Sequence, residues 1–249
     1  MRWNTICFDL DNTLFSHEDA FEQAVKHTFY TMYQTGSTGN PFAEVDAKDW
    51  FRTFKYHSDL LWAYYEQNNW THDEYRKKRF DETMKAFSLP YARGDAEQFH
   101  EQYEKVVADF CVPFEGVYEL LDRLLKEGLR LGIITNGRTK TQRKKWQKLQ
   151  LDSFIPESHL IVSEEAAVEK PEREMFDYAL QQLQGETAGS LFIGDSWELD
   201  VQGAIHAGWD AVFLNTRGEE RTTSDAPAAE HKSFQETARF LLQSLRLKG

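Results

Sequence analysis

The chain has few cysteines and no long hydrophobic run. Its 249 residues include two cysteines, Cys7 and Cys111, and both lie in apolar stretches. Two cysteines are too few for a disulfide framework, so we expect free thiols and a cytoplasmic protein. No apolar stretch approaches the roughly 18 residues of a membrane-spanning helix. A strand-like segment at residues 5–8 follows the first residues directly, which predicts the absence of a secretory signal peptide.

Basic residues are outnumbered by acidic ones. The chain has 29 Lys and Arg against 41 Asp and Glu, which gives a formal net charge of −12. Because nucleic acids are bound mainly through their phosphates by basic surfaces, this balance argues against a nucleic acid polymer as partner. The remaining composition is ordinary for a folded domain, and the length suffices for one large domain or two modest ones. We expect no membrane partner, and a monomer or homodimer.

The second half of the chain has the pattern of an α/β domain. Short apolar runs, each read as a strand, alternate there with amphipathic helical stretches; they lie at residues 129–134, 159–162, 190–193 and 211–214. This alternation predicts a Rossmann-like parallel sheet with helices on both faces. The apolar run at residues 5–8 supplies one more strand of that sheet.

Between the first strand and the rest of the sheet, the pattern is almost wholly helical. Helices are expected at residues 17–35, 46–67, 71–87 and 95–110, with Thr71 and Asp95 as N-caps and a loop at 36–41. Most of the aromatic residues lie in this region, where helical spacing predicts a packed core. We therefore predict an all-helical cap domain at residues 15–111, inserted into an α/β core domain at residues 1–14 and 112–249.

Two acids follow the first strand directly. Asp9 and Asp11 are two residues apart, so in an extended chain both carboxylates point to the same side. At about 4 Å, like charges cost roughly 1 kcal/mol in water and about 4 kcal/mol at an effective dielectric near 20. A fold tolerates this cost when a cation lies between the acids or one acid holds a proton. The structural alternative is a strand followed by an Asx-type turn, which needs only Asn12 or one of the two aspartates.

Polar residues follow other strands as well. Thr135 and Asn136 come after the second apolar run, Lys170 lies beyond the third, and Asp195 and Asp200 follow the fourth. Each segment alone fits a turn, a solvated loop or a helix N-cap. Ligands bind at the carboxyl ends of strands in an open parallel sheet, so the set as a whole predicts one site.

The motifs that carry these residues resemble those of the haloacid dehalogenase-like hydrolase superfamily. They are DLDNT at residues 9–13, ITNG at 134–137, EKP at 169–171 and GDSWELD at 194–200. The resemblance covers the α/β domain and implies that Asp9 is a nucleophile that forms an aspartyl-phosphate. It implies that Asp11 is the general acid and then the general base.

The resemblance also assigns the binding groups. Thr135 and Asn136 would hold phosphate oxygens, and Lys170 would offset negative charge on the nucleophile and the phosphate. Mg²⁺ would be held by Asp9, by the backbone carbonyl of Asp11 and by Asp195. Asp200 would orient Lys170 or a metal-bound water.

Asp11 bears on the type of reaction. A general acid must carry a proton, and raising a carboxyl pKa by two units takes about 2.7 kcal/mol. We expect burial and the neighbouring acids to raise the pKa of Asp11 in this way. The dehalogenases of the superfamily lack an acid at this position because halide leaves without protonation, so Asp11 favours a phosphatase.

The finer resemblance concerns the substrate. The sequence VSEE at residues 162–165, together with ITNG, is similar to pyrimidine 5′-nucleotidases. The implied substrate is a small phosphorylated metabolite such as a nucleoside 5′-monophosphate; a sugar phosphate or phosphoglycolate-like compound is the alternative. Trp62, Tyr65 and Phe15 are candidate platforms for a base, although burial in the core is the more usual role of aromatics.

Two basic stretches are open to more than one interpretation. Arg79, in the basic patch at residues 76–79, is a candidate contact for the substrate phosphate or base edge. The favoured alternative is a solvated helix face paired with neighbouring acids, namely Asp73, Glu74 or Asp81. The stretch 138–148 holds six basic residues and no acid, and a solvated helix is favoured there over attraction of anions.

Two other classes of protein compete with an enzyme. An aspartate-phosphorylated signalling domain also combines strand-end acids with Thr or Ser and Lys, but such a module would be shorter and uncapped. A non-catalytic binding protein would not need the complete set of acids. We therefore favour a Mg²⁺-dependent phosphomonoesterase.

Overall fold

The α/β unit is built on a parallel sheet. The computed structural model describes residues 2–35, 39–68 and 70–246, and within these ranges the sheet has six strands in the order β3-β2-β1-β4-β5-β6. The strands are β1 (Thr5–Phe8), β2 (Arg130–Thr135), β3 (Leu160–Val162), β4 (Ser190–Gly194), β5 (Asp210–Leu214) and β6 (Ala229–His231). Every neighbouring pair is parallel. All residues of β1, β3 and β4 are buried, as expected for a sheet covered on both faces.

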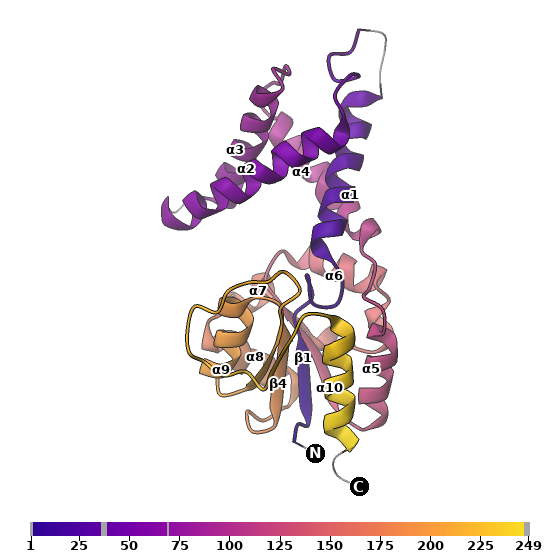
Figure 1. The fold of residues 1–249 in the computed structure, drawn as a ribbon, viewed down its shortest axis with the longest axis vertical. Coiled ribbons are helices and arrows are strands. Elements are labelled where there is room, and N and C mark those ends of the chain that lie inside the picture. Colours follow the sequence, from indigo (N-terminus) through magenta and orange to yellow (C-terminus); the bar gives the residue numbers. More distant parts are fainter. Residues whose placement is uncertain (1, 36–38, 69, 247–249) are drawn as a thin grey trace. The chain divides into compact units, whose positions relative to one another are not determined.

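Helices cover both faces of this sheet. They are α5 (Val117–Lys126), α6 (Thr139–Lys148), α7 (Ser163–Ala166), α8 (Arg173–Leu183), α9 (Gly203–His206) and α10 (Phe234–Arg246). Helices α5 and α10 contact each other on one face, and α8 and α9 contact each other on the opposite face (Figure 1). On the latter face, Met175 and Phe176 of α8 pack in one buried cluster with Cys7 and Phe192 of the sheet. The predicted α/β fold is confirmed.

The strand order brings the ends of β1 and β4 together. The chain begins at β1, adds β2 and β3 on one side, and then crosses to β4 on the other, so the order reverses between β1 and β4. Phe8 is level with Ile193, and the Asp9 backbone N–H donates to the Ile193 carbonyl at 2.8 Å. Residues that follow these two strands therefore meet at the switch point of the sheet, where ligands of such folds bind.

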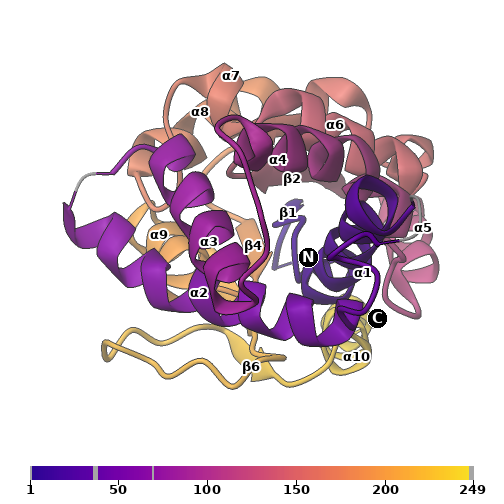
Figure 2. The same ribbon diagram turned by 90° about the horizontal axis from the view of Figure 1, so that it is seen from above.

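Residues 18–110 form a second compact unit. Its helices are α1 (His17–Phe29), whose first residue belongs to the α/β unit, α2 (Ala47–Asn68), α3 (His72–Ala86) and α4 (Asp95–Val106). Helix α3 contacts both α2 and α4 (Figure 2). Trp50 is fully buried and stacks on Phe29 at 4.5 Å and on Phe54 at 5.1 Å between ring centroids. Aromatics at helical spacing therefore form the core of this unit, as predicted.

The predicted helix boundaries hold at Thr71 but not at Asp95. Thr71 and Glu74 form a capping box at the start of α3. The N-cap of α4 is Gly94, in the left-handed region with φ of 101°. Asp95 instead accepts a hydrogen bond from the Ala92 N–H at 2.7 Å, which closes the preceding turn.

Other segments differ from the prediction in detail. The first helix of the second unit changes to a π-helical turn at Tyr30–Gln34, and another π-helical segment, Trp197–Gln202, precedes α9. Strand β6 was not predicted, because its three half-buried residues form no apolar run. The expected loop at 36–41 lies partly outside the described residues. Among the residues that the structure covers, no helix has the length and apolar character to cross a membrane.

Candidate active site

Lys170 lies between two carboxylates at the switch point of the sheet. Its Nζ atom donates to Asp9 Oδ1 and to Asp200 Oδ1, each at 2.6 Å. All three residues are buried, with 3% of Lys170 exposed. A buried ammonium needs such partners, because leaving one charge uncompensated costs several kcal/mol. The structure thus joins three of the predicted site residues.

Asp195, which follows β4, completes a group of three acids. One carboxylate oxygen each from Asp9, Asp195 and Asp200 lies within 4.8 Å of the other two. Close approach of Asp200 requires Gly194, since a Cβ atom there would lie 2.3 Å from Asp200 Oδ2 and 2.4 Å from its Cβ. The Ser196 N–H also donates to Asp200 Oδ2 at 3.0 Å, which fixes this carboxylate.

The crowding of these acids raises two of their pKa values. Burial, followed by the charges of Asp200 and Asp11, raises the pKa of Asp9 to about 7, although Lys170 opposes the change. Burial and the charges of Asp200 and Asp9 raise the pKa of Asp195 to about 8. The pKa of Lys170 is raised because the two carboxylates outweigh its burial. Without a metal ion, protonation relieves the repulsion among these acids, and their hard oxygen donors suit a divalent cation such as Mg²⁺.

Arg217 is a site residue that the sequence did not indicate. It lies in the connection between β5 and β6, which extends from the sheet in Figure 2, and its Nη2 atom is 2.6 Å from Asp195 Oδ2. Thr13 donates to the other oxygen of Asp195 at 3.4 Å. The Asn215 side chain accepts from the N–H and donates to the carbonyl of Glu219, which stabilises this connection.

The ITNG motif contributes groups with two different tasks. Asn136 uses its side chain to hold the Lys170 backbone, accepting from the N–H at 2.9 Å and donating to the carbonyl at 3.0 Å. The Thr135 hydroxyl is buried and accepts a hydrogen bond from Gln142 Nε2 at 2.6 Å. The Asn136 side chain thus anchors the loop of Lys170.

Asp11 points into a different set of partners from Asp9. Lys145 Nζ of α6 lies 2.7 and 2.9 Å from its two oxygens, and Gln142 Nε2 lies 2.9 Å from Oδ2. His17 Nδ1 lies 3.4 Å from Oδ1. Burial favours the neutral acid, but Lys145 and His17 outweigh burial and lower the pKa of Asp11 to about 2. The predicted rise in the pKa of Asp11 is therefore wrong for this structure, because the prediction did not place the Lys145 cation beside this carboxylate.

The basic stretch at residues 138–148 is only partly the solvated helix that we favoured. Arg138, Lys140 and Lys148 are exposed, whereas Lys145 is buried. Gln142 and Lys145, three residues apart, share the face of α6 that meets Asp11. This spacing was the available signal, and the high charge of the helix concealed it.

Within the second unit, Arg79 is buried and does not form the solvated face that we favoured. Its guanidinium lies 4.8 Å from the centre of the Phe54 ring and 5.1 Å from that of Tyr75. Trp62 is 41% exposed and contacts Tyr65 at 5.0 Å. In the α/β unit, Phe15 is fully buried, so its ring is a core residue and offers no exposed face for a base.

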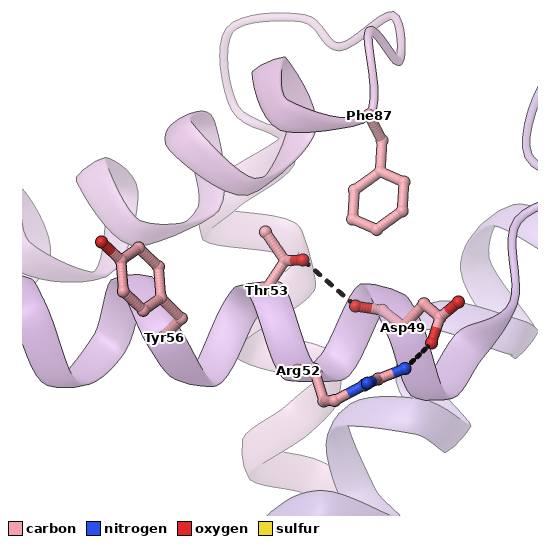
Figure 3. Close-up of a pocket in the computed structure, with 5 residues that line it drawn as sticks. All are labelled: Asp49, Arg52, Thr53, Tyr56 and Phe87. Atoms are coloured by element: carbon pink, nitrogen blue, oxygen red, sulfur yellow. Dashed lines mark hydrogen bonds and ion pairs between the residues drawn. The ribbon is translucent and has the colours of Figure 1, made fainter.

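The second unit also has a pocket of about 350 Å³, away from the motif residues in the chain. It is lined by Asp49, Arg52, Thr53, Tyr56 and Phe87 (Figure 3). Asp49 and Arg52 form an ion pair there, and the Thr53 hydroxyl donates to the Asp49 carbonyl at 3.2 Å. Because these polar groups bind one another, we assign no ligand to this pocket.

Comparisons with known proteins identify the family. Residues 3–208 match the family model of the haloacid dehalogenase-like (HAD) hydrolases, and the chain belongs to this family. It is 27% identical over 242 residues to the pyrimidine 5′-nucleotidase YjjG of Escherichia coli, covering 97% of this chain and 99% of that protein. It is 29% identical over 210 residues to the glyceraldehyde 3-phosphate phosphatase of Pyrococcus abyssi, with coverage of 84% and 80%.

A solved structure supports the fold. The magnesium-bound HAD-hydrolase YfnB of Bacillus subtilis superposes with a TM-score of 0.79 at 24% identity, covering 97% of this chain and 99% of that chain. The family and the curated relatives together make this protein a HAD-family phosphatase, and they confirm the resemblance to pyrimidine 5′-nucleotidases that the motifs indicated.

Proposed function

We propose that the protein is a Mg²⁺-dependent phosphomonoesterase that acts on a nucleoside 5′-monophosphate through an aspartyl-phosphate at Asp9. The observation that carries this proposal is the buried contact of Asp9 with Lys170 at 2.6 Å, beside two further acids. A carboxylate approaches a phosphate dianion only when positive charge offsets their repulsion. Lys170 supplies one such charge next to the nucleophile.

The reaction would proceed in two displacements. A carboxylate oxygen of Asp9 forms a bond to phosphorus while the bond from phosphorus to the leaving oxygen breaks, and protonated Asp11 gives its proton to that oxygen. Water then attacks phosphorus, Asp11 takes a proton from the water, and the bond to Asp9 breaks to release inorganic phosphate. The negative charge of a bound substrate would raise the low pKa of Asp11 and favour its protonated form.

The remaining residues would bind and orient. Thr135 and the backbone at Asn136 would hold phosphate oxygens, and Asp200 would keep Lys170 in place. Asp9 and Asp195, with the Asp11 backbone carbonyl, would hold Mg²⁺, which when bound would neutralise charge on the phosphate. The residues present fit this ion, because three buried carboxylates supply hard oxygen donors within 4.8 Å of one another.

The choice of substrate class is supported by the relatives. YjjG, named as a pyrimidine 5′-nucleotidase, matches this chain over nearly its whole length. A sugar phosphate is the second candidate, supported by the similarity to the glyceraldehyde 3-phosphate phosphatase. In both cases residues 15–111 would act as a cap over the substrate, with Arg79, Trp62 and Tyr65 as candidate substrate contacts.

A substrate screen tests the proposal. We expect multiple turnover with Mg²⁺ on p-nitrophenyl phosphate and on UMP or dTMP, with weaker turnover of sugar phosphates and phosphoglycolate. Preference for a sugar phosphate would select the second candidate. Uptake of a single equivalent of phosphate would instead support the signalling alternative.

The variant Asp9→Asn tests the nucleophile. It should lower kcat by more than about 10³-fold while circular dichroism stays unchanged. Asp152→Asn, at an exposed acid of the same unit, is the matched control and should retain activity. Full activity in Asp9→Asn would remove Asp9 as the nucleophile.

A further inference from the structure

The contacts of Asp11 give an assignment beyond the motif residues. Lys145 is 4% exposed, and its Nζ atom lies 2.7 and 2.9 Å from the two oxygens of Asp11. An ammonium that is buried without a carboxylate partner is costly, so each group of this pair fixes the position of the other. The contact joins α6 to the end of β1, across 134 residues of sequence.

Gln142 ties the same carboxylate to the predicted phosphate-binding residue. Its Nε2 atom lies 2.9 Å from Asp11 Oδ2, 2.6 Å from Thr135 Oγ1 and 3.2 Å from the Asn136 carbonyl. Gln142 is 2% exposed, so it exchanges these partners for water only if the site opens. Lys145 and Gln142 together set the direction of the Asp11 side chain relative to Thr135.

This arrangement separates two neighbouring acids. Asp9 contacts Lys170 and belongs to the group of three acids that suits a metal. The carboxylate of Asp11 contacts a different lysine, Lys145 on α6, whereas Lys170 lies in the connection between α7 and α8. A nucleophile and an acid that serve one phosphoryl group must approach it from different directions, because the attacking and leaving oxygens lie roughly in line.

We propose that Lys145, assisted by Gln142, is a positioning residue that directs the Asp11 carboxylate toward the leaving oxygen and away from the acid cluster. This inference rests on the proposed function, in which Asp11 protonates the leaving group. Lys145 acts through Asp11 and need not touch the substrate. Loss of Lys145 would then impair the reaction in proportion to its need for a general acid.

The test compares two leaving groups. The sugar alkoxide of UMP needs a proton to depart, whereas p-nitrophenolate departs without one, and general acid catalysis contributes about 10²–10⁴-fold. We expect Lys145→Met to lower kcat/KM by about 10²-fold on UMP, or on the best alkyl phosphate of the screen, and by less than about 5-fold on p-nitrophenyl phosphate. Lys145→Arg should restore most of the loss, because it returns a cation to Asp11.

Two further variants keep the test decisive. Lys140→Met, at an exposed lysine of the same helix, is the matched control and should leave both rates unchanged. Gln142→Leu should also lower kcat/KM on UMP more than on p-nitrophenyl phosphate, by a smaller factor than Lys145→Met. It replaces Lys145→Met in the test if the Lys145→Met protein fails to fold. An equal loss on both substrates, or no loss on either, would overturn the assignment while the phosphatase function stands. Failure of the wild-type protein to hydrolyse any phosphomonoester would overturn both.

Discussion

Asp9 and Asp11 have opposite electrostatic surroundings although one residue separates them in the chain. The pKa of Asp9 is raised to about 7, mainly by burial, and that of Asp11 is lowered to about 2 because Lys145 and His17 outweigh burial. Near neutral pH, and without a metal ion, Asp11 is therefore fully ionised while Asp9 holds a proton for part of the time. A nucleophile must be ionised, so positive charge brought to the acid cluster favours the reactive form of Asp9.

The raised pKa values predict how the stability of the metal-free protein depends on pH. Asp9 and Asp195 have pKa values of about 7 and 8 in the folded state, against about 3.9 for an unfolded chain. Between these values the folded state binds more protons than the unfolded state, so the free energy of unfolding falls as the pH rises. In EDTA, we expect Tm to fall by at least about 3 °C between pH 5 and pH 8, measured by scanning calorimetry.

A variant separates the contribution of Asp9 and Asp195 to the pH dependence of Tm from that of other titrating groups. Asp195→Asn removes one of the two acids and should flatten the decline in Tm over the same pH range. The low pKa of Asp11 acts in the opposite direction only below about pH 4, outside the window. The pKa of His17, which burial lowers to about 4, opposes part of the decline between pH 5 and about pH 6.5. A Tm that rises from pH 5 to pH 8 in the wild-type protein would contradict the electrostatic account of the cluster.

At this scale, strand ends were predictable and side-chain partners were not. Asp9, Asp195 and Lys170 follow apolar runs, and parallel strands bring such ends together. The contact of Lys145 with Asp11 depends on which face of α6 turns toward the sheet, and that of Arg217 with Asp195 depends on the conformation of a long connection. Neither property is encoded by the local pattern alone.

At the scale of elements, the last residue of β4 must lack a side chain, because the Asp200 carboxylate packs directly against it. Gly194 allows the Asp200 carboxylate to approach within a distance that a Cβ atom would block, and Asp200 in turn holds Lys170. A single backbone position therefore sets the spacing between a strand and the segment that follows it.

Gly194→Ala tests this constraint. The new Cβ would lie 2.3 Å from Asp200 Oδ2, so the Asp200 side chain, which also holds Lys170, must shift. We expect kcat on p-nitrophenyl phosphate to fall by more than about 10-fold, with a loss of about 2 kcal/mol in the free energy of unfolding measured with urea. The matched control is Gly132→Ala in β2, where the atoms nearest to the new Cβ belong to the side chains of Cys7 and Leu183, at 3.0 Å or more. That variant should lose stability without a selective loss of kcat, and equal activity losses in the two variants would count against the explanation.

The capping box of α3 gives a prediction that concerns stability alone. The Thr71 hydroxyl accepts from the Glu74 N–H at 3.2 Å, and the Glu74 carboxylate accepts from the Thr71 N–H at 2.7 Å. Thr71→Ala should lower the free energy of unfolding by about 1 kcal/mol in urea titrations, and Thr71→Ser should retain most of it. An unchanged free energy of unfolding in Thr71→Ala would show that tertiary packing, and not the cap, fixes the start of α3.

The elements also show what periodicity can predict. The strands of the sheet interior are continuous apolar runs and the helices of both units carry clear apolar faces, so their existence followed from the sequence. Strand β6 pairs only with β5, at the edge of the sheet, and its half-buried Ala229–His231 segment has no apolar signal. Asp95 was predicted as the N-cap of α4, but the N-cap is Gly94, whose backbone lies in the left-handed region.

At the scale of the whole molecule, the three acids of the candidate active site all belong to one of two compact units. Asp9, Asp195 and Asp200 all belong to the unit formed by residues 1–17 and 111–249. The other unit has its own aromatic core around Trp50. Ligands of the acid cluster should therefore act first on the stability of the α/β unit.

Magnesium ion added to the metal-free protein tests this division. A ligand that binds only the folded state raises the free energy of unfolding by about 2.7 kcal/mol when its free concentration is 100 times Kd. We expect this stabilisation in the backbone segments that the ion orders. In hydrogen exchange measured by mass spectrometry, Mg²⁺ should slow exchange in peptides that contain Asp9 or Asp195, while peptides of α3 keep their rates. Asp195→Asn should abolish the protection, since it removes one carboxylate of the cluster. Equal protection of α3 would contradict the prediction and would mean that the ion also orders the helical unit; no protection anywhere would count against a metal at these acids.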